Sequence, residues 1–253
     1  MRFDSKTVIV TGAASGIGAA TARRFAEEGA NLVIVDMDET DLDRVADDLP
    51  PGRVRSICGD TSGKAVMEEA VQKATDVFGG VDVVVPNAGY ATTGTISDVT
   101  SDQFRDQIHN NVDSTFNAMK AAWPALKLSR GCVVATSSVS GERGDFGGYA
   151  YNASKGAVSN MVRAAALDFG DHGIRVNAVA PGFTHTGMTA PMEDDAEFLD
   201  SMKSRIPMGR GGNPEEIAAV IVFLASGDAS FINGAVLPVD GGVSASNGQP
   251  PLA

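Results

Sequence analysis

The stretch Thr11-Gly12-Ala13-Ala14-Ser15-Gly16-Ile17-Gly18 decides the fold of this chain. An apolar run of strand length, residues 7–10, leads into it, and an amphipathic stretch, residues 19–28, follows at once. Glycines at these positions allow a tight turn, and they let the backbone approach a pyrophosphate at the positive end of the helix. Because the turn stands between a strand and a helix, the pattern predicts a dinucleotide-binding unit.

The next apolar run, residues 32–35, ends at Asp36. An acidic residue at this point accepts hydrogen bonds from an adenosine ribose, and its charge repels a 2′-phosphate. Neither Ser15 nor Met37 supplies the cation that NADP would need. The pattern therefore favours NAD as the cofactor. A role for Asp36 as a helix cap or turn residue is the alternative, which the glycine turn disfavours.

The same alternation of short apolar runs and longer helical patterns continues along the whole chain. Continuous apolar runs separated by helices indicate a parallel sheet that is covered on both faces. We therefore predict an α/β fold: a single domain, residues 1–253, with a doubly wound, Rossmann-like parallel sheet of about seven strands and helices on both faces. The strand runs are residues 7–10, 32–35, 54–57, 81–85, 132–135, 176–179 and 235–239, and the helical patterns are 19–28, 65–78, 103–127, 153–169 and 214–225.

One segment, residues 183–212, is irregular and contains a short helical patch at 193–204. It follows a strand end, where ligands bind in open α/β sheets, so we predict a loop that covers the substrate. A surface excursion without a role in binding is the alternative. The polar tail, residues 244–253, is expected to fray or to pack against a neighbouring subunit.

The net charge of −12 disfavours nucleic acids and anionic membranes as partners. No apolar segment reaches the length of a membrane span, and the start of the chain lacks the pattern of a signal peptide, so we expect a cytoplasmic protein.

Cys58 and Cys132 lie in apolar runs and are expected to be buried. The three histidines are scattered along the chain, so no metal site is predicted.

Tyr151 and Lys155 stand four residues apart, on one face of a predicted helix. A free tyrosine has a pKa of about 10, and a nearby cation lowers that value by stabilising the phenolate. The pair therefore suggests a general acid or base. On its own, such a pair is more often a tyrosine ring packed on a lysine side chain.

Two further features give the pair a context. Ser138 ends the apolar strand that begins after Gly131, and a parallel sheet delivers strand ends to the ligand-binding edge. Asn111 lies midway along a predicted helix, an unfavourable place for a side chain that competes with the backbone. Together with the glycine turn, these residues imply hydride transfer coupled to proton transfer.

These motifs, in this order, resemble the short-chain dehydrogenase/reductase family, in its branch of about 250 residues. The resemblance runs from about residue 4 to residue 243, and as an ordered set the motifs are highly specific. They are Thr11-Gly-x-x-x-Gly-x-Gly18, Asp60, Asn87-Ala88-Gly89, Asn111, Ser138, Tyr151-x-x-x-Lys155, Asn177, Pro181-Gly182 and Val239-Asp240-Gly241-Gly242.

The resemblance implies a catalytic set. Tyr151 would be the general acid or base, and Ser138 would hold the substrate oxygen. Lys155 would lower the pKa of the tyrosine and bind the nicotinamide ribose, and Asn111 would position a water in a proton relay to Lys155. In the oxidative direction, the Tyr151 phenolate would take the hydroxyl proton of the substrate.

The resemblance also implies the cofactor contacts. Ile17 would lie against the nicotinamide half, Asp60 would bind the adenine amino group, and Asn87 would lie beside the adenosine ribose. The complete predicted cofactor set is Gly12, Ser15, Gly16, Ile17, Gly18, Asp36, Asp60, Thr61, Asn87, Ala88, Gly89, Tyr151, Lys155, Pro181, Gly182, Thr184 and Thr186.

Two departures from the family pattern affect the expected site. Pro86 replaces the first Asn of Asn-Asn-Ala-Gly, and it removes a backbone N–H at a strand end. Thr184-His185 replaces an aliphatic residue followed by Arg, so His185 is either a substrate contact or a solvated loop residue.

We expect an NAD-dependent oxidoreductase that interconverts a secondary alcohol and a ketone. The loops around the site mix Gly, Phe, Met and Thr, which favours a small, neutral, moderately apolar substrate, although Arg143 leaves an anionic one open. One alternative is a 3-oxoacyl-carrier-protein reductase, which Asp36, His172 and the acidic surface disfavour. Another is a dinucleotide-sensing protein without catalysis, which the intact catalytic set disfavours. A homotetramer is expected from the resemblance.

Overall fold

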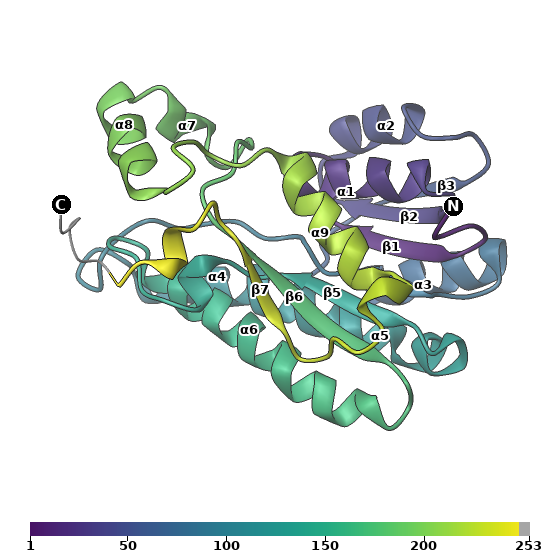
Figure 1. The fold of residues 1–253 in the computed structure, drawn as a ribbon. Coiled ribbons are helices and arrows are strands. Elements are labelled where there is room, and N and C mark those ends of the chain that lie inside the picture. The colour runs from purple at the N-terminus through teal and green to yellow at the C-terminus, as the bar shows by residue number, and fades with distance from the viewer. Residues whose placement is uncertain (248–253) are drawn as a thin grey trace.

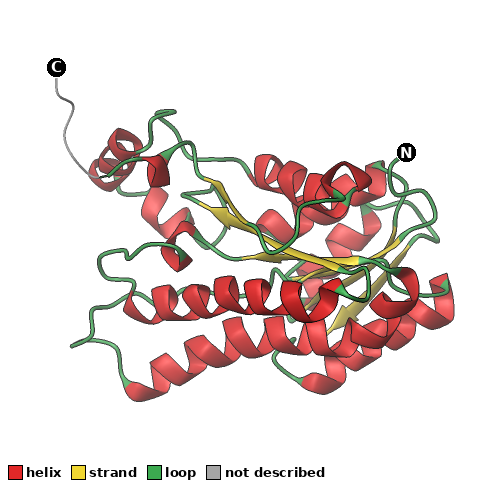
Figure 2. Ribbon diagram, turned by 60° about the horizontal axis from the view of Figure 1, so that its bottom comes forward, coloured by secondary structure: helices red, strands yellow, loops and turns green. Residues whose placement is uncertain are grey.

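The computed structural model describes residues 1–247 and contains a seven-stranded parallel sheet between two layers of helices (Figures 1 and 2). The strand order is β3-β2-β1-β4-β5-β6-β7. This arrangement confirms the predicted fold class. The strands are β1 (Thr7–Thr11), β2 (Asn31–Asp36), β3 (Val54–Cys58), β4 (Val83–Val85), β5 (Cys132–Thr136), β6 (Arg175–Pro181) and β7 (Val236–Val239).

The strands pack against helices on both faces because alternate side chains point to opposite sides. From β1, Val8 and Val10 enter the cluster that α1, α2 and α9 cover, while Ile9 enters the cluster that α3, α5 and α6 cover. The helices are α1 (Gly16–Glu27), α2 (Glu39–Asp47), α3 (Lys64–Phe78), α4 (Ser101–Ile108), α5 (Ser114–Ser129), α6 (Tyr149–Gly170), α7 (Ala190–Glu193), α8 (Ala196–Arg205) and α9 (Pro214–Ala225).

The predicted helix at residues 103–127 is in fact two helices joined by a π-helical turn. This turn, η1 (His109–Asp113), separates α4 from α5. Single π-turns inside helices are frequent at functional sites because they move one residue out of the regular helical register. In this chain the turn contains Asn111, which the sequence had marked as unusual for a helix.

Strand order reverses at β1, which pairs with β2 on one side and with β4 on the other. In the register of these pairs, Val10 lies opposite both Ile34 and Val85. The chain leaves β1 and β4 in opposite directions at their carboxyl ends, which opens a crevice there. This crevice is where the glycine turn lies.

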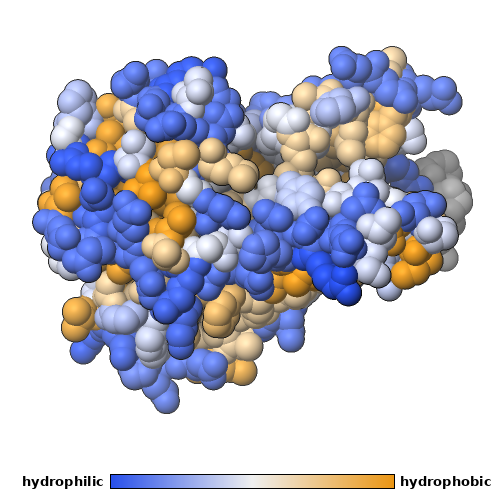
Figure 3. All heavy atoms as spheres, turned by 180° about the vertical axis from the view of Figure 1, so that it is seen from behind, coloured by the Kyte–Doolittle hydropathy of each residue, from blue (hydrophilic) through white to orange (hydrophobic). Residues whose placement is uncertain are grey.

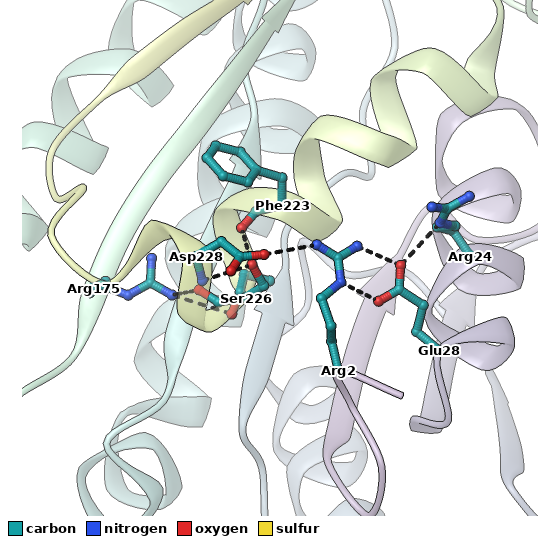
Figure 4. Close-up of polar contacts among 8 residues, drawn as sticks. Arg2, Arg24, Glu28, Arg175, Phe223, Ser226 and Asp228 are labelled. Atoms are coloured by element: carbon teal, nitrogen blue, oxygen red, sulfur yellow. Dashed lines mark hydrogen bonds and ion pairs between the residues drawn. The ribbon is translucent and has the colours of Figure 1, made fainter.

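The amino edge of the sheet, at the other end of the strands, holds a group of charged contacts (Figure 4). The Arg2 guanidinium donates to Glu28 at the end of α1, at 2.6 Å, and to Asp228 beyond α9, at 3.5 Å. Arg175 donates to the carbonyl oxygens of Leu224, Ala225 and Ser226, the last residues of α9 and its cap. These contacts fix the two helices at the edge away from the crevice.

Residues 183–212 leave the sheet after β6 and carry α7 and α8, seen at the upper left of Figure 1. The two ends of this excursion meet: His185 N donates to Gly212 O at 2.9 Å, and Gly212 N donates to Phe183 O at 2.9 Å. Seen from behind, a hollow separates the excursion from the rest of the surface (Figure 3). The helical patch predicted at 193–204 corresponds closely to α8.

The prediction that Cys58 is buried is wrong. Cys58 is exposed because it ends β3, the edge strand, whose outer side no other strand covers. Cys132 lies in β5 in the middle of the sheet, and its burial is confirmed. Part of the predicted tail, residues 248–253, lies outside the described residues. No helix in residues 1–247 is long and apolar enough to cross a membrane.

Candidate active site

A cleft of about 360 Å³ lies at the carboxyl edge of the sheet. Ser138 and all the predicted cofactor residues except Gly18 line it, and Asn111 lies behind it. The structure thus brings together residues from the first two-thirds of the chain, from the end of β6 and from the 183–212 excursion. It also adds residues outside the predicted catalytic and cofactor sets: Met37, Gly59, Tyr90, Asn110, Thr136, Ser137, Gly187, Met188 and Thr189.

The glycine turn is packed too closely for side chains. Gly12 has a positive φ of 65°, and a Cβ there would lie 2.8 Å from the Cα of Ala88. At Gly18, a Cβ would lie 1.9 Å from the carbonyl oxygen of Gly12. Gly18 therefore allows α1 to start directly against the turn and has no direct place in the cleft lining.

Asn87 connects the glycine turn to the neighbouring strands. Its Nδ2 donates to the carbonyl oxygens of Thr11 and Gly12, at 3.1 and 3.2 Å, and its Oδ1 accepts a hydrogen bond from Thr136 at 3.0 Å. The side-chain amide is thus occupied in holding β1 and β5 together. Pro86 follows β4 directly, and its carbonyl oxygen accepts from Thr136 N, so the missing N–H leaves the strand intact.

The carboxylate of Asp36 lies at the end of β2 and lines the cleft. One oxygen accepts from Ala14 N in the glycine turn at 3.0 Å, and the other accepts from Asp38 N at 3.1 Å. Asp36 therefore holds the local turn, as the alternative interpretation predicted, and also lines the cleft. Beside it, the Met37 side chain is exposed and carries no charge.

Tyr151 and Lys155 project from α6 toward Ser138 at the end of β5. The Lys155 ammonium lies 5.8 Å from the centre of the Tyr151 ring and donates to Thr136 O at 2.9 Å. Burial lowers the pKa of Lys155 to about 8. Lys155 is thus a desolvated cation next to the phenol.

The prediction that Lys155 lowers the pKa of Tyr151 stays a prediction, and in this structure other groups act on the phenol. Burial raises the pKa of Tyr151 above its ordinary value, while a hydrogen bond with Ser138 acts in the lowering direction and the charge of Asp145 adds to the rise. Desolvation outweighs the hydrogen bond because the phenolate loses more hydration than one hydroxyl restores. The phenol is therefore held in its protonated form.

Ser138 belongs to a short chain of hydroxyl groups. Its Oγ donates to Ser140 Oγ at 3.1 Å, and Ser140 in turn donates to a carboxylate oxygen of Asp145. Because a carboxylate only accepts, the direction of both bonds is fixed. The Ser138 side chain is thereby tied to Asp145 through Ser140, a connection that sequence spacing did not indicate.

Asn111 lies behind Gly89, where a Cβ on the glycine would come within 2.7 Å of Asn111 Oδ1 and 3.6 Å of Lys155 Nζ. Its Oδ1 accepts from Tyr90 N, and its Nδ2 donates to Tyr90 O and to Ser154, all at 3.0 Å. The amide thus fixes the loop at Tyr90 to the second turn of α6, beside Lys155.

Sequence reasoning missed Gln107 as a support of the same loop. This fully buried side chain donates to Tyr90 O at 2.7 Å and accepts from Thr92 N at 2.6 Å. An amide on the buried face of a helix was the available signal. His185 contacts Glu193 within the excursion at 2.9 Å and stacks edge-on against Phe183.

Comparison with known proteins now identifies the family. The family model described as enoyl-(acyl carrier protein) reductase matches residues 12–244. A short-chain dehydrogenase/reductase structure from Brucella melitensis superposes with a TM-score of 0.91, at 37% identity over 96% of this chain and 98% of the other. The chain belongs to the short-chain dehydrogenase/reductase family.

Two curated members of this family are similar to the chain over its whole length. A meso-2,3-butanediol dehydrogenase from Serratia marcescens is 44% identical over 100% of both chains. A 3-oxoacyl-[acyl-carrier-protein] reductase from Thermotoga maritima is 37% identical over 96% of this chain and 99% of the relative. The chain is an oxidoreductase that acts on the CH–OH group of secondary alcohols, and the family uses a nicotinamide cofactor.

Proposed function

We propose that this protein is an NAD-dependent dehydrogenase that interconverts a small, neutral secondary alcohol and its ketone. The observation that carries the choice of NAD is Asp36. Its carboxylate lines the cleft and is held by two backbone N–H groups, and the neighbouring Met37 carries no charge. A 2′-phosphate would meet this carboxylate without a compensating cation.

The residues around the glycine turn fit a dinucleotide. The N-cap of α1, Ser15, makes no side-chain hydrogen bond to the helix, and the first turn contains no acidic residue. By contrast, Asp38 caps α2, and Glu39 and Asp41 lie in its first turn. The amino end of α1 therefore keeps its N–H groups and positive potential for an anion.

The proposed chemistry divides between cofactor and protein. The nicotinamide supplies a hydride acceptor or donor. Ser138 and Tyr151 hold the substrate oxygen, and the Tyr151 hydroxyl exchanges its proton with that oxygen. Lys155, charged below about pH 8, stabilises negative charge on the phenolic oxygen when that proton leaves.

The raised pKa of Tyr151 gives this proposal a direction in pH. Because the phenol stays protonated at neutral pH, it is in the form that donates a proton to a ketone. Alcohol oxidation requires the phenolate, whose population grows as the pH rises. We expect oxidation to speed up with pH, and reduction to be favoured at lower pH.

Small diols are the substrates that we propose to test first. The relatives include enzymes named for meso-2,3-butanediol and for galactitol, and both substrates carry adjacent hydroxyl groups. Met188 lines the cleft, and Phe183 lies at the base of the excursion, so an apolar part of the substrate would find contacts there. The segment 183–212 is proposed to cover the bound substrate.

The test is a comparison of initial rates. Purified protein is given meso-2,3-butanediol, 2-butanol or a cyclic vicinal diol, each with NAD⁺ and with NADP⁺, and reduced cofactor is read by absorbance. We expect turnover with NAD⁺ and a rate at least tenfold lower with NADP⁺. A preference for NADP⁺ would refute the cofactor assignment, and absence of turnover with binding of NAD⁺ intact would refute small diols as the substrate class.

A carrier-protein reductase would behave differently in the same assay. It would prefer NADPH and a 3-oxoacyl thioester over small diols. His172, where we expected a carrier-binding arginine in such a reductase, packs edge-on against Trp123 with ring centres 4.9 Å apart. It is thus part of an aromatic contact instead of a cationic patch.

We also propose that the protein is a homotetramer in the cytoplasm. Large apolar side chains are exposed on α5 and α6, namely Phe116 at 52%, Leu128 at 89% and Leu167 at 83%. Exposed apolar groups of this kind favour a subunit contact. The apolar patches in Figure 3 lie between polar ones. Light scattering tests the assembly, and a monomer would refute it.

A further inference from the structure

Four side chains form a line from the surface to the adenine end of the cleft. Asp113 Oδ2 lies 2.9 Å from His109 Nδ1, and His109 Nε2 lies 2.9 Å from Ser62 Oγ. Ser62 Oγ donates to Asp60 Oδ1 at 2.7 Å, and Ser62 N donates to the same oxygen at 2.9 Å. The line joins the π-helical turn to the loop between β3 and α3.

Counting protons shows which charge state fits all the contacts. A carboxylate only accepts, so the contact with Asp113 places a proton on Nδ1 of His109. In the neutral ring, Nε2 is then an acceptor, and it competes with Asp60 for the single proton of Ser62. In the charged ring, Nε2 donates to Ser62, and Ser62 donates to Asp60. Only the charged form makes every contact a hydrogen bond.

The inner end of the line belongs to the cofactor cleft. Asp60 lines the cleft, and so does Asn110, which follows His109 directly. The hydrogen bond from the Ser62 hydroxyl is the largest influence on the pKa of Asp60 and lowers it, and the charge of His109 acts in the same direction. Ser62 is buried at 6% exposure, so water does not replace this bond freely.

We propose that His109 is a positioning residue that, through Ser62, couples dinucleotide affinity to pH. This inference rests on the proposed function, because it assumes that Asp60 receives the adenine end of the cofactor. When His109 is charged, the Ser62 proton is committed to Asp60, and the carboxylate is fixed with one oxygen bonded and the other turned to the ligand. When His109 loses its proton, Ser62 divides its hydrogen bond and Asp60 is held less firmly.

The charges around His109 favour this arrangement. Asp113 on its own turn and Asp60 across the line are both acidic. On α4, the nearby cation Arg105 is paired with Asp102, and Asp106 follows it. On α3, Lys64 is paired with Glu68. On α5, Lys120 lies about two helical turns after Asp113 in the chain. On α6, Lys155 is bonded to Thr136. No cation among these groups is bonded to the line within residues 1–247.

Binding and protonation are linked in both directions. Histidine changes charge between about pH 5 and pH 8. If the charged form of His109 binds the dinucleotide more tightly, then binding must favour uptake of a proton by His109. The affinity therefore falls as the pH rises. One lost or shared hydrogen bond to a charged group predicts a change of about tenfold.

The experiment measures binding without turnover. Isothermal titration with NAD⁺ and with ADP-ribose, which lacks nicotinamide, gives the affinity at about pH 5 and about pH 7.5. These values lie on either side of the ordinary pKa of histidine, about 6.5, and below the pKa of Lys155, about 8, so Lys155 stays mostly charged at both. The variants are His109→Gln, whose charge does not change, and Asp113→Asn. The asparagine amide can donate to Nδ1, so the neutral ring keeps its proton on Nε2 and still donates to Ser62. His172→Gln, which alters a histidine outside the cleft, is the matched control.

We expect wild type and His172→Gln to bind both ligands about tenfold more weakly at the higher pH. The His109→Gln variant should lose this dependence, and Asp113→Asn should bind tightly at both values. A wild type without pH dependence, or an undiminished dependence in His109→Gln, would overturn the proposal while leaving the proposed function standing. Failure of the wild type to bind either ligand at either pH would overturn both.

Discussion

Replacing Lys155 by Met should make the folded protein more stable while it removes activity. Burial lowers the pKa of Lys155 from 10.5 to about 8, so the native state binds its proton less well than the unfolded chain does. At about 1.4 kcal/mol for each pH unit, the buried charge costs about 3 kcal/mol at neutral pH. Methionine removes this cost but also the hydrogen bond to Thr136 O, a loss of about 1 kcal/mol. The net gain expected at pH 7 is about 2 kcal/mol.

The sign of the pH dependence makes this prediction specific. The folded-state pKa is depressed, so the penalty is complete below about pH 8 and disappears as the pH rises toward 10.5, where the unfolded chain also loses the proton. The advantage of Lys155→Met should therefore shrink to near zero at about pH 9.5.

Urea unfolding, followed by circular dichroism at one fixed protein concentration, measures both values. Lys73→Met, at an exposed position of α3, is the matched control and should change stability by less than about 0.5 kcal/mol at either pH. If Lys155→Met is no more stable than wild type at pH 7, or if its advantage does not shrink with pH, the reasoning about the buried charge is wrong.

Three further substitutions test the proposed site. Tyr151→Phe should reduce turnover by at least about 100-fold and leave NAD⁺ affinity within about twofold, since it removes only the phenolic hydroxyl and keeps the ring; activity near wild type would contradict the assignment. Asp36→Ser combined with Met37→Arg should raise the NADPH-to-NADH rate ratio by at least about tenfold, and an unchanged ratio would mean that Asp36 does not set cofactor choice. Gly18→Ala should abolish dinucleotide binding in titration calorimetry, because its Cβ would lie 1.9 Å from a backbone oxygen of the turn; Gly227→Ala, at an open position, should bind normally.

Much of the fold could be predicted because parallel strands are buried on both faces and leave continuous apolar runs. The strand β5 illustrates this, since all its residues are buried. The helix α2 was missed because only Leu42 and Val45 are buried in it, and the rest of its surface is polar. Burial is also predicted wrongly on edge strands. Cys58 ends an apolar run, but no strand lies on the outer side of β3, so its side chain is exposed.

The candidate site was predictable where a motif gives both a residue and its neighbours in sequence. The glycine turn and the Tyr151–Lys155 pair are of this kind. Contacts between distant segments leave no such trace. His109 lies 47 residues from Ser62, and their contact depends on the π-helical turn. The hydrophobic pattern of the sequence did not predict this turn. The supporting amide of Gln107 is likewise visible only once the loop it holds has been placed.

The closed ends of the 183–212 excursion have a consequence for how this enzyme can change. Two backbone hydrogen bonds join Phe183 and His185 to Gly212, so the chain enters and leaves α7 and α8 at one point. These two hydrogen bonds close the loop at its base. The entropic cost of this closure rises only slowly with the number of residues in the loop. The excursion is a replaceable part: its helices can be lengthened, shortened or exchanged for another substrate while the sheet and the proton-transfer residues keep their places.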